Sequence, residues 1–186
     1  MQSSGVREHI SKLITCDSFI PKHEVLEKAN RKHGVMVDRI KNIFEKMGKY
    51  CEKEYKVIYG NLKGIIDLVC SDNERDFIIE VKSTHASHAR LQDLLQLSIY
   101  AYLYTAQKQD NEKEVELALM YKYGDKTKEK IFVLKIEGDD LKNRLIDLGE
   151  RLAGTGTRHS DKELFVVSDL CNICENNKCP FKPISG

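Results

Sequence analysis

Three short apolar segments follow one another in the first half of the chain, separated only by polar turns. They span residues 55–59, 62–70 and 77–83, with residues 60–61 and 71–76 between them. Segments of this length and composition are typical of β-strands, and connections this short join antiparallel neighbours. The sequence therefore predicts an antiparallel meander.

Helical periodicity on both sides of the meander supplies most of the remaining elements. Three- and four-residue steps separate the apolar residues Val37, Ile40, Phe44 and Met47, and a broad leucine-rich face follows the meander. The other predicted elements are a helix over 25–47, a helix over 90–105, strands over 115–123 and 130–136, and a closing helix over 139–153. This order predicts an α/β fold in which helices flank a central sheet.

Length and composition indicate one globular domain over residues 1–186. Hydrophobic residues make up 41% of the chain and charged residues 32%, which excludes a disordered protein. No apolar run approaches the roughly 18 residues of a membrane span, and residues 1–10 are mostly polar, so we expect no membrane contact and an intracellular, cytoplasmic location. Because the net charge is only +1, contact with DNA must be local or helped by bound metal cations.

Charged residues interrupt two of the predicted strands. Glu80 and Lys82 point to the same face of their strand, because successive side chains alternate, and Asp67 interrupts the preceding apolar strand. Burial of a lone charge is costly unless it is paired or binds a metal, and two converging carboxylates suit a hard divalent cation such as Mg²⁺. Lys82 would then position or deprotonate an attacking water and stabilise charge on a phosphate.

A structural ion pair between Asp67 and Lys82 is the alternative explanation of these charges. The following helix favours a functional site, because Gln92, Gln96 and Tyr100 fall at four-residue steps and line one face. This polar face would meet the charged strands, although an ordinary solvent-exposed face has the same pattern.

A second group of residues that suits a metal lies near the end of the sequence. Cys171, Cys174 and Cys179 form a C-x₂-C-x₄-C motif, whose spacing indicates metal binding in a reduced compartment. A structural Zn²⁺ site and an iron–sulfur cluster would each need a fourth ligand. Cys16 is the candidate, because it lies in a polar stretch outside the predicted sheet.

The remaining cysteines, Cys51 and Cys70, lie at a helix–strand junction and at the end of a strand. A small buried thiol is common at such positions. Because the cytosol keeps thiols reduced and a core of this size needs no cross-link, we expect no disulfide here.

Asp67, the run Glu80-Val81-Lys82 and the run from Gln96 to Tyr100 together resemble the D…ExK…QxxxY motifs of RecB-like nucleases in the PD-(D/E)XK superfamily. The residue before Asp67 is not the proline of the superfamily's name, but RecB-like members commonly read G-x-x-D at this place. The resemblance implies a RecB-like PD-(D/E)XK nuclease core, a central mixed sheet flanked by helices, and metal-dependent cleavage of DNA.

The resemblance also implies roles for individual residues. Asp67, Glu80 and the main-chain carbonyl of Val81 would hold Mg²⁺ or Mn²⁺, and Lys82 would serve the attacking water. The glutamine and tyrosine of QxxxY would orient that lysine or the substrate phosphate. The implied catalytic residues are thus Asp67, Glu80, Lys82, Gln96 and Tyr100.

RecB-like members usually carry a metal-ligating histidine on the first helix, in a G-x-x-x-H setting. Here the residue four positions after Gly34 is Asp38, and a carboxylate is a harder ligand than an imidazole. His33 is the alternative, but it precedes Gly34, and we expect its side chain to point away from the face that Asp38 occupies. We therefore favour Asp38 as the metal ligand on this helix.

One cysteine before the nuclease motifs and three after them resemble the iron-staple arrangement of the CRISPR-associated RecB-like exonucleases. The resemblance implies that Cys16, Cys171, Cys174 and Cys179 hold a [4Fe–4S] cluster that joins the N- and C-terminal segments. It further implies action on single-stranded DNA ends in CRISPR adaptation (spacer acquisition), with the adaptation integrase proteins as partners. The rival hypotheses are a viral or recombination-type RecB-like nuclease outside CRISPR, and a catalytically silent, zinc-stabilised module that binds DNA or protein.

Overall fold

The computed structural model of the chain describes residues 8–9, 23–85, 89–108, 113–123, 130–154 and 175. Its elements are β1 (Glu8–His9), α2 (His23–Lys46), β2 (Tyr50–Tyr59), β3 (Leu62–Ser71), β4 (Arg75–His85), α3 (Leu91–Gln107), β5 (Glu114–Tyr123), β6 (Lys130–Ile136) and α4 (Asp139–Gly154). Every helix and strand that the sequence predicts is present, and the two-residue strand β1 is an addition.

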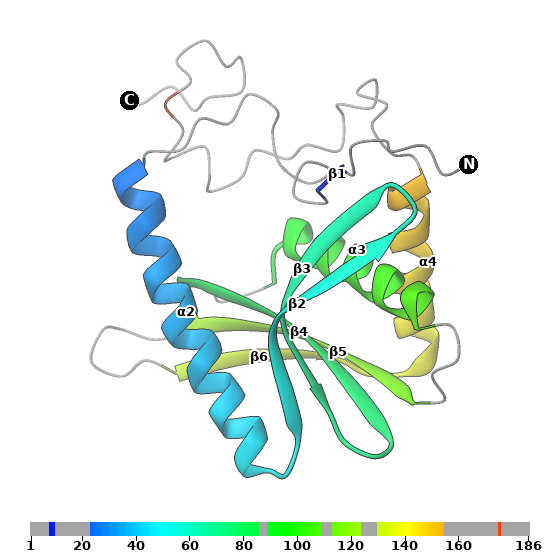
Figure 1. Cartoon of the computed structure of the whole chain (residues 1–186), viewed down its shortest axis with the longest axis horizontal. Helices are drawn as coiled ribbons and strands as arrows, with labels where there is room; N and C mark the ends of the chain where they lie inside the picture. Colours follow the sequence, from blue (N-terminus) through cyan, green and yellow to red (C-terminus); the bar gives the residue numbers. More distant parts are fainter. Residues whose placement is uncertain are drawn as a thin grey trace.

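The described strands form one six-stranded mixed sheet (Figure 1). Its order is β1-β3-β4-β5-β6, and β2 also pairs with β3. β2, β3 and β4 are successive antiparallel neighbours, which confirms the predicted meander. β5 lies parallel to β4, so the chain has to cross over between them, and α3 forms that crossover.

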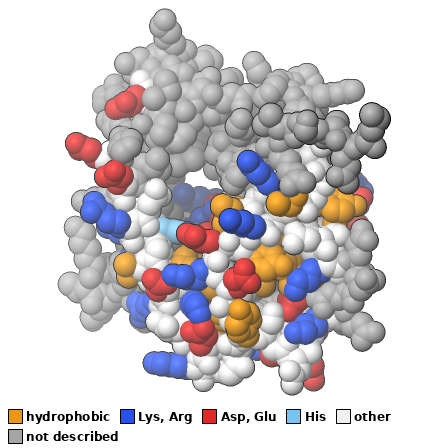
Figure 2. Space-filling model, in the orientation of Figure 1, with side chains coloured by type: hydrophobic (Ala, Val, Ile, Leu, Met, Phe, Trp, Pro, Cys, Tyr) orange, Lys and Arg blue, Asp and Glu red, His pale blue; other side chains and the backbone are white. Residues whose placement is uncertain are grey.

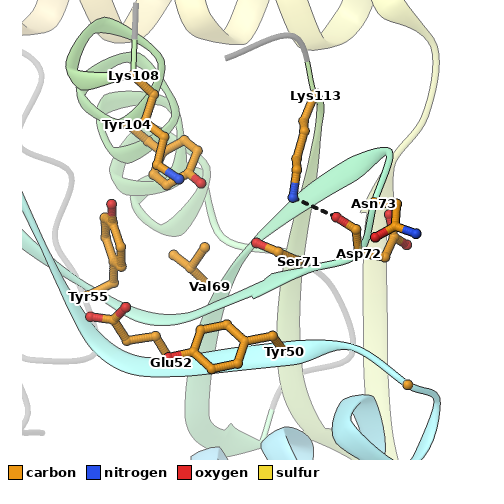
Figure 3. Close-up of a pocket in the computed structure, with 11 residues that line it drawn as sticks. Tyr50, Glu52, Tyr55, Val69, Ser71, Asp72, Asn73, Tyr104, Lys108 and Lys113 are labelled. Atoms are coloured by element: carbon orange, nitrogen blue, oxygen red, sulfur yellow. Dashed lines mark hydrogen bonds between the residues drawn. The ribbon is translucent and has the colours of Figure 1, made fainter. Parts of the chain in front are cut away.

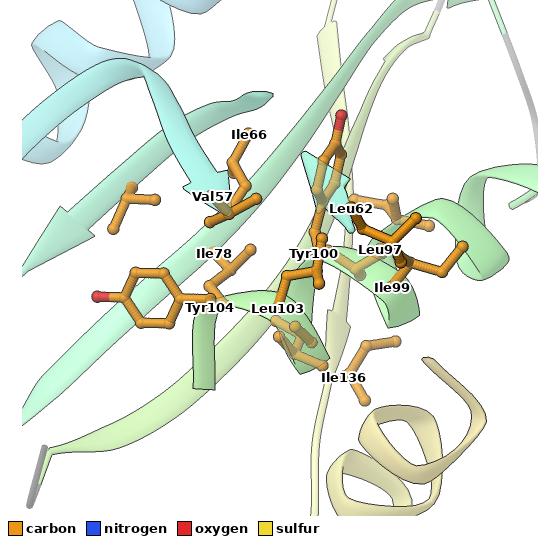
Figure 4. Packing of buried hydrophobic residues seen from close by; sticks show 14 of the residues in the cluster. Val57, Leu62, Ile66, Ile78, Leu97, Ile99, Tyr100, Leu103, Tyr104 and Ile136 are labelled. Atoms are coloured by element: carbon orange, nitrogen blue, oxygen red, sulfur yellow. The ribbon is translucent and has the colours of Figure 1, made fainter. Parts of the chain in front are cut away.

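Helices cover both faces of the sheet, so the strands have apolar side chains on both faces. α2 packs on a cluster that includes Leu68 and Ile79. α3 and α4 pack on the other cluster, which includes Val69 and Ile78 and is shown in Figure 4. Consecutive residues on one strand therefore point to opposite helix layers, and nearly continuous apolar runs result.

The element boundaries differ from the prediction mainly around the first helix and the strand after it. β2 begins at Tyr50, because a run of mostly exposed, charged residues extends the strand before its apolar part. α2 ends at Lys46, and Met47 is 67% exposed, so it does not belong to the buried helix face as predicted. Gly48 follows with φ of +80°, a left-handed conformation that favours glycine and ends the helix.

Cys51 and Cys70 contradict the expectation of free thiols. They are directly opposite each other in the β2–β3 register, both are buried, and a disulfide joins them. Directly opposed residues of an antiparallel pair have Cβ atoms close enough for such a bond. The predicted burial is confirmed, whereas the prediction that no disulfide forms is wrong because β2 reaches back to Cys51.

Charged side chains of both signs are interspersed on the face of the molecule shown in Figure 2. This mixture agrees with the net charge of +1. Attraction of a polyanion such as DNA would then depend on local groups rather than on overall charge. Among the described helices, none is both long and apolar enough to cross a membrane.

Candidate active site

β3 and β4 separate at the two carboxylates predicted to hold a metal. Their register ends with the Leu68–Ile79 pair, and Asp67 and Glu80 are the next residues on the two strands. Here the main-chain N–H of Val81 donates to Oδ2 of Asp67 at 2.8 Å. The backbone of β4 therefore fixes the Asp67 carboxylate in the opening between the strands, which we call the fork.

Lys82 lies at the fork and is held by two hydrogen bonds and an ion pair. Its Nζ donates to Oε1 of Glu80 at 2.8 Å and to Oε1 of Gln96 at 2.6 Å. Nε2 of Gln96 in turn donates to the hydroxyl of Tyr100 at 3.2 Å. Oδ1 of Asp93 lies 3.4 Å from the same Nζ. The polar face of α3 therefore meets the charged face of β4, as the sequence predicts.

Two opposing effects act on the pKa of Lys82. Burial alone would lower it, but the carboxylates of Glu80 and Asp93 outweigh burial and raise it. Lys82 is accordingly an ammonium that donates hydrogen bonds in this arrangement.

Glu80 is a buried carboxylate, and only one of its two oxygens accepts a hydrogen bond from a described residue. Its side chain is 4% exposed, and Oε2 has no hydrogen-bond partner among the described residues. Burial raises the pKa of Glu80, and the nearby charge of Asp67 raises it further. A buried polar atom without a partner is unusual in a native protein. A hard divalent cation would satisfy it, because such cations prefer carboxylate oxygens and would offset both negative charges.

His33 contacts the site from α2, contrary to the expectation from sequence. Its Nε2 lies 3.0 Å from Oδ1 of Asp67, and this hydrogen bond raises the pKa of the imidazole. Asp38, which was favoured, has a side chain that is 55% exposed and binds Lys53 on β2. The two side chains do lie on different faces of α2, as expected, but the face that meets Asp67 is that of His33 and not that of Asp38. His33 lies four residues before the buried Val37, so helical periodicity places it on the inner face.

Asp93 and Tyr121 are also part of this cluster, although the sequence did not single them out. The hydroxyl of Tyr121 donates to Oδ2 of Asp93 at 2.7 Å. Asp93 had a detectable signal, because it lies three residues before Gln96 and shares its helix face. Tyr121 had none, because its position depends on which strand lies beside β4.

No three His, Cys, Asp or Glu side chains within the described ranges are already arranged to hold a metal ion. The fork offers instead the carboxylates of Asp67 and Glu80, and the resemblance implies the carbonyl of Val81 as a third ligand. Mg²⁺ is often bound through one or two carboxylates, while waters and substrate phosphates complete its shell. The donor set at the fork therefore fits a divalent cation of this kind.

The predicted cluster ligands Cys16, Cys171, Cys174 and Cys179 all lie outside the described residues. Their grouping remains a prediction. Cys51 and Cys70, which were predicted to take no part in the cluster, are bonded to each other.

A pocket of about 450 Å³ opens elsewhere, between β2 and the last turns of α3 (Figure 3). Its lining residues include Tyr50, Tyr55, Tyr104 and Lys113. The residues of the nuclease motifs do not line it, and Tyr104 there donates a hydrogen bond to the buried Asp76. This pocket is therefore distinct from the fork, where the reactive groups are gathered.

The sequence matches the model of a known group of enzymes. The family model for the PD-(D/E)XK nuclease superfamily matches residues 4–184. The chain belongs to the PD-(D/E)XK nuclease superfamily. Membership implies a nuclease that cleaves phosphodiester bonds in DNA, and PD-(D/E)XK nucleases typically use Mg²⁺ or Mn²⁺. The mixed sheet flanked by helices is consistent with the PD-(D/E)XK core.

A solved structure has a similar overall fold. The crystal structure of the protein SSO0001 aligns with a TM-score of 0.51 and 15% sequence identity, covering 99% of this chain and 91% of that chain. At this level of identity the likeness shows the fold alone. No curated protein matches the sequence.

Proposed function

We propose that this PD-(D/E)XK nuclease is a metal-dependent exonuclease that acts on the ends of single-stranded DNA. The observation that carries the chemistry is the fork, where a buried carboxylate oxygen that has no partner among the described residues lies beside a fixed lysine. Hydrolysis of a phosphodiester needs positive charge near the phosphate and an oriented water. The preference for single-stranded ends is supported by the resemblance to the CRISPR-associated exonucleases.

Asp67, Glu80 and the carbonyl of Val81 would hold the divalent cation, with His33 bound to Asp67 beside them. When bound, the cation would supply Lewis-acid stabilisation of the charge that develops on the phosphate. Lys82 would donate a hydrogen bond to the attacking water or to a phosphate oxygen. The glutamine and tyrosine of α3 would keep that ammonium directed at the reacting group.

End-labelled DNA distinguishes an exonuclease from other nucleases. The purified chain is incubated with linear single strands labelled at either end, with a linear duplex and with a circular single strand, in Mg²⁺, in Mn²⁺ and with a chelator. We expect metal-dependent shortening of the linear single strand and an intact circle. Cleavage of the circle would contradict an exonuclease, and no cleavage of any substrate with either metal would contradict a nuclease.

We further propose that Cys16, Cys171, Cys174 and Cys179 bind a [4Fe–4S] cluster. Support comes from the C-x₂-C-x₄-C spacing, and from one cysteine before the motifs and three after them. Iron and sulfide analysis of anaerobically purified wild type and Cys16→Ala tests both the cofactor and this ligand. Zinc in place of iron would reject the cofactor and favour the zinc-stabilised alternative. Full iron content in Cys16→Ala would reject that residue as a ligand.

The proposed setting is the cytoplasm, where the enzyme would trim DNA ends for CRISPR adaptation together with the integrase proteins. The buried Cys51–Cys70 bond would there be one of the uncommon disulfides in a reducing compartment. This setting is supported by the iron-staple resemblance. Binding of the purified chain to adaptation integrase proteins tests it. Robust exonuclease activity without such binding would favour a viral or recombination-type enzyme.

A further inference from the structure

Asp93 and Tyr121 form a hydrogen-bonded pair next to Lys82. The hydroxyl of Tyr121 donates to Oδ2 of Asp93 at 2.7 Å, and Oδ1 of Asp93 lies 3.4 Å from Nζ of Lys82. The main-chain N–H of Arg90 donates to the same tyrosine hydroxyl at 3.3 Å. Both carboxylate oxygens of Asp93 are thus engaged, one by a fixed tyrosine and the other by the lysine.

The fold determines the direction of each of these side chains. Tyr121 is the partner of Lys82 in the parallel β4–β5 register, so both side chains leave the same face of the sheet. Tyr121 is fully buried, and the side chain of Asp93 is 13% exposed. Asp93 and Gln96 are three residues apart on α3, so both reach the lysine from one helix face.

Glu80 has two tasks at the fork, because it accepts a hydrogen bond from Lys82 and is a proposed ligand of the cation. One of its oxygens accepts from the lysine, and the other has no partner among the described residues. A cation that shares the charge of Glu80 leaves less of that charge to attract Lys82. Gln96 still accepts a hydrogen bond from the ammonium but carries no charge, so Asp93 is then the carboxylate that keeps an ion pair with it.

We propose that Asp93, anchored by Tyr121, is a positioning residue that keeps the Lys82 ammonium at the fork when the charge of Glu80 is engaged elsewhere. The meaning of this role for catalysis rests on the proposed function. The retention of Lys82 by Asp93 is a property of the protein alone and is testable without metal or DNA. Asp93→Asn suits the test, because it keeps the acceptor for Tyr121 and removes the charge.

Lysine side-chain NMR of the metal-free protein provides this test. The ¹⁵Nζ–¹H signal of an ammonium is observed when its protons exchange slowly with water, as they do when acceptors hold it. Glu80→Gln removes the competing charge, and we expect the Lys82 signal to persist in this variant. It should disappear in Glu80→Gln/Asp93→Asn and persist in the matched control Glu80→Gln/Asp140→Asn, which changes an exposed aspartate on α4. Loss of the signal in Glu80→Gln, or its survival in Glu80→Gln/Asp93→Asn, would overturn the inference.

Cleavage kinetics provide a readout that a merely structural residue would not give. Asp93→Asn and Tyr121→Phe should each lower kcat by about 10- to 100-fold, as supporting residues around a metal site commonly do. KM for DNA should change little, because neither side chain is assigned a contact with the substrate. An unchanged kcat in folded Asp93→Asn would contradict the positioning role. An inactive wild-type protein would instead contradict the proposed function, and the NMR result would still decide the role of Asp93.

Discussion

Glu80 and Lys82 are two residues apart on β4, and both leave the strand toward the fork. Glu80→Ala and Lys82→Ala are each expected to lower the rate of DNA cleavage by about three orders of magnitude or more, because each removes one member of a catalytic set. The rate is measured with end-labelled DNA, and folding is checked by circular dichroism.

Lys53→Ala is the matched control for the lysine variant. It removes the same charge from an exposed side chain, whose ion pair is with the exposed Asp38 and not with a carboxylate of the fork. Wild-type cleavage is expected for this control. Cleavage at a near wild-type rate by well-folded Lys82→Ala would show that the lysine has no role in the reaction.

The two candidate metal-site residues on α2, His33 and Asp38, can be distinguished in the same way, by comparing one variant with a matched control. His33→Ala should raise the Mn²⁺ concentration needed for half-maximal activity, because His33 contacts the proposed ligand Asp67. Loss of such a neighbour typically costs about 10- to 100-fold in metal affinity or activity. Asp38→Ala serves as the control and should have little effect. A larger effect at Asp38 would contradict the placement of His33 at the fork.

At this scale the sequence predicted the site residues on β4 and α3, but not which face of α2 meets the site. Strand alternation has a period of two, so the shared face of Glu80 and Lys82 could be predicted from their spacing alone. Asp38 has the spacing from Gly34 that the G-x-x-x-H motif predicts, whereas the four-residue step from His33 to Val37 places the histidine on the buried face of α2. The helical period alone is therefore enough to place His33 on the face of α2 that packs against the sheet.

Among the elements, α4 depends on a glycine for its close approach to α3. A Cβ added to Gly149 would lie 2.0 Å from the main-chain oxygen of Ser98, and a backbone atom cannot give way easily. Gly149→Ala is therefore expected to lower the free energy of unfolding by about 1–3 kcal/mol, as overpacking does. Urea denaturation measures the change.

Gly34→Ala provides the control within another helix. A Cβ at this position meets nothing within 4 Å, so the substitution should stabilise α2 by about 0.5–1 kcal/mol through helix propensity. If Gly149→Ala proved equally stabilising, the close contact between α3 and α4 would be refuted.

The disulfide between β2 and β3 is a second test at the scale of elements. It joins residues with a sequence separation of 19, and cross-linking a loop of this size typically contributes about 3 kcal/mol. Cys51→Ala/Cys70→Ala should therefore lower the free energy of unfolding by that amount, and reductant should have the same effect on the wild type. Rapid alkylation of Cys51 and Cys70 in denatured, unreduced protein would show that the bond is absent.

Element prediction succeeded where a buried face imposes a period, and it failed where the strand is polar. The boundaries of β6 were predicted to the residue, whereas the first half of β2 was missed because charged residues dominate it. The two residues of β1 are too few to show any period. The disulfide was not expected because a reducing compartment was assumed, and because the polar start of β2 concealed that Cys51 lies opposite Cys70.

For the whole molecule, the α/β class could be predicted because strands and helices alternate along the sequence. The neighbour of β4 could not, because the crossover through α3 and the packing of the helix layer determine it. This pairing matters for the site, since it places Tyr121 beside Lys82. The hydrogen bond between Asp93 and Tyr121 therefore depends on β5 lying beside β4.

The side chains of the fork belong to α2, β3, β4 and α3, and β5 adds Tyr121 from the strand beside β4. They therefore extend along the chain from His33 to Tyr121. A ribosome must complete most of the polypeptide before the groups needed for cleavage can meet. Incomplete translation products that end before β5 lack part of this arrangement. The complete site therefore forms only after the chain has been made through β5.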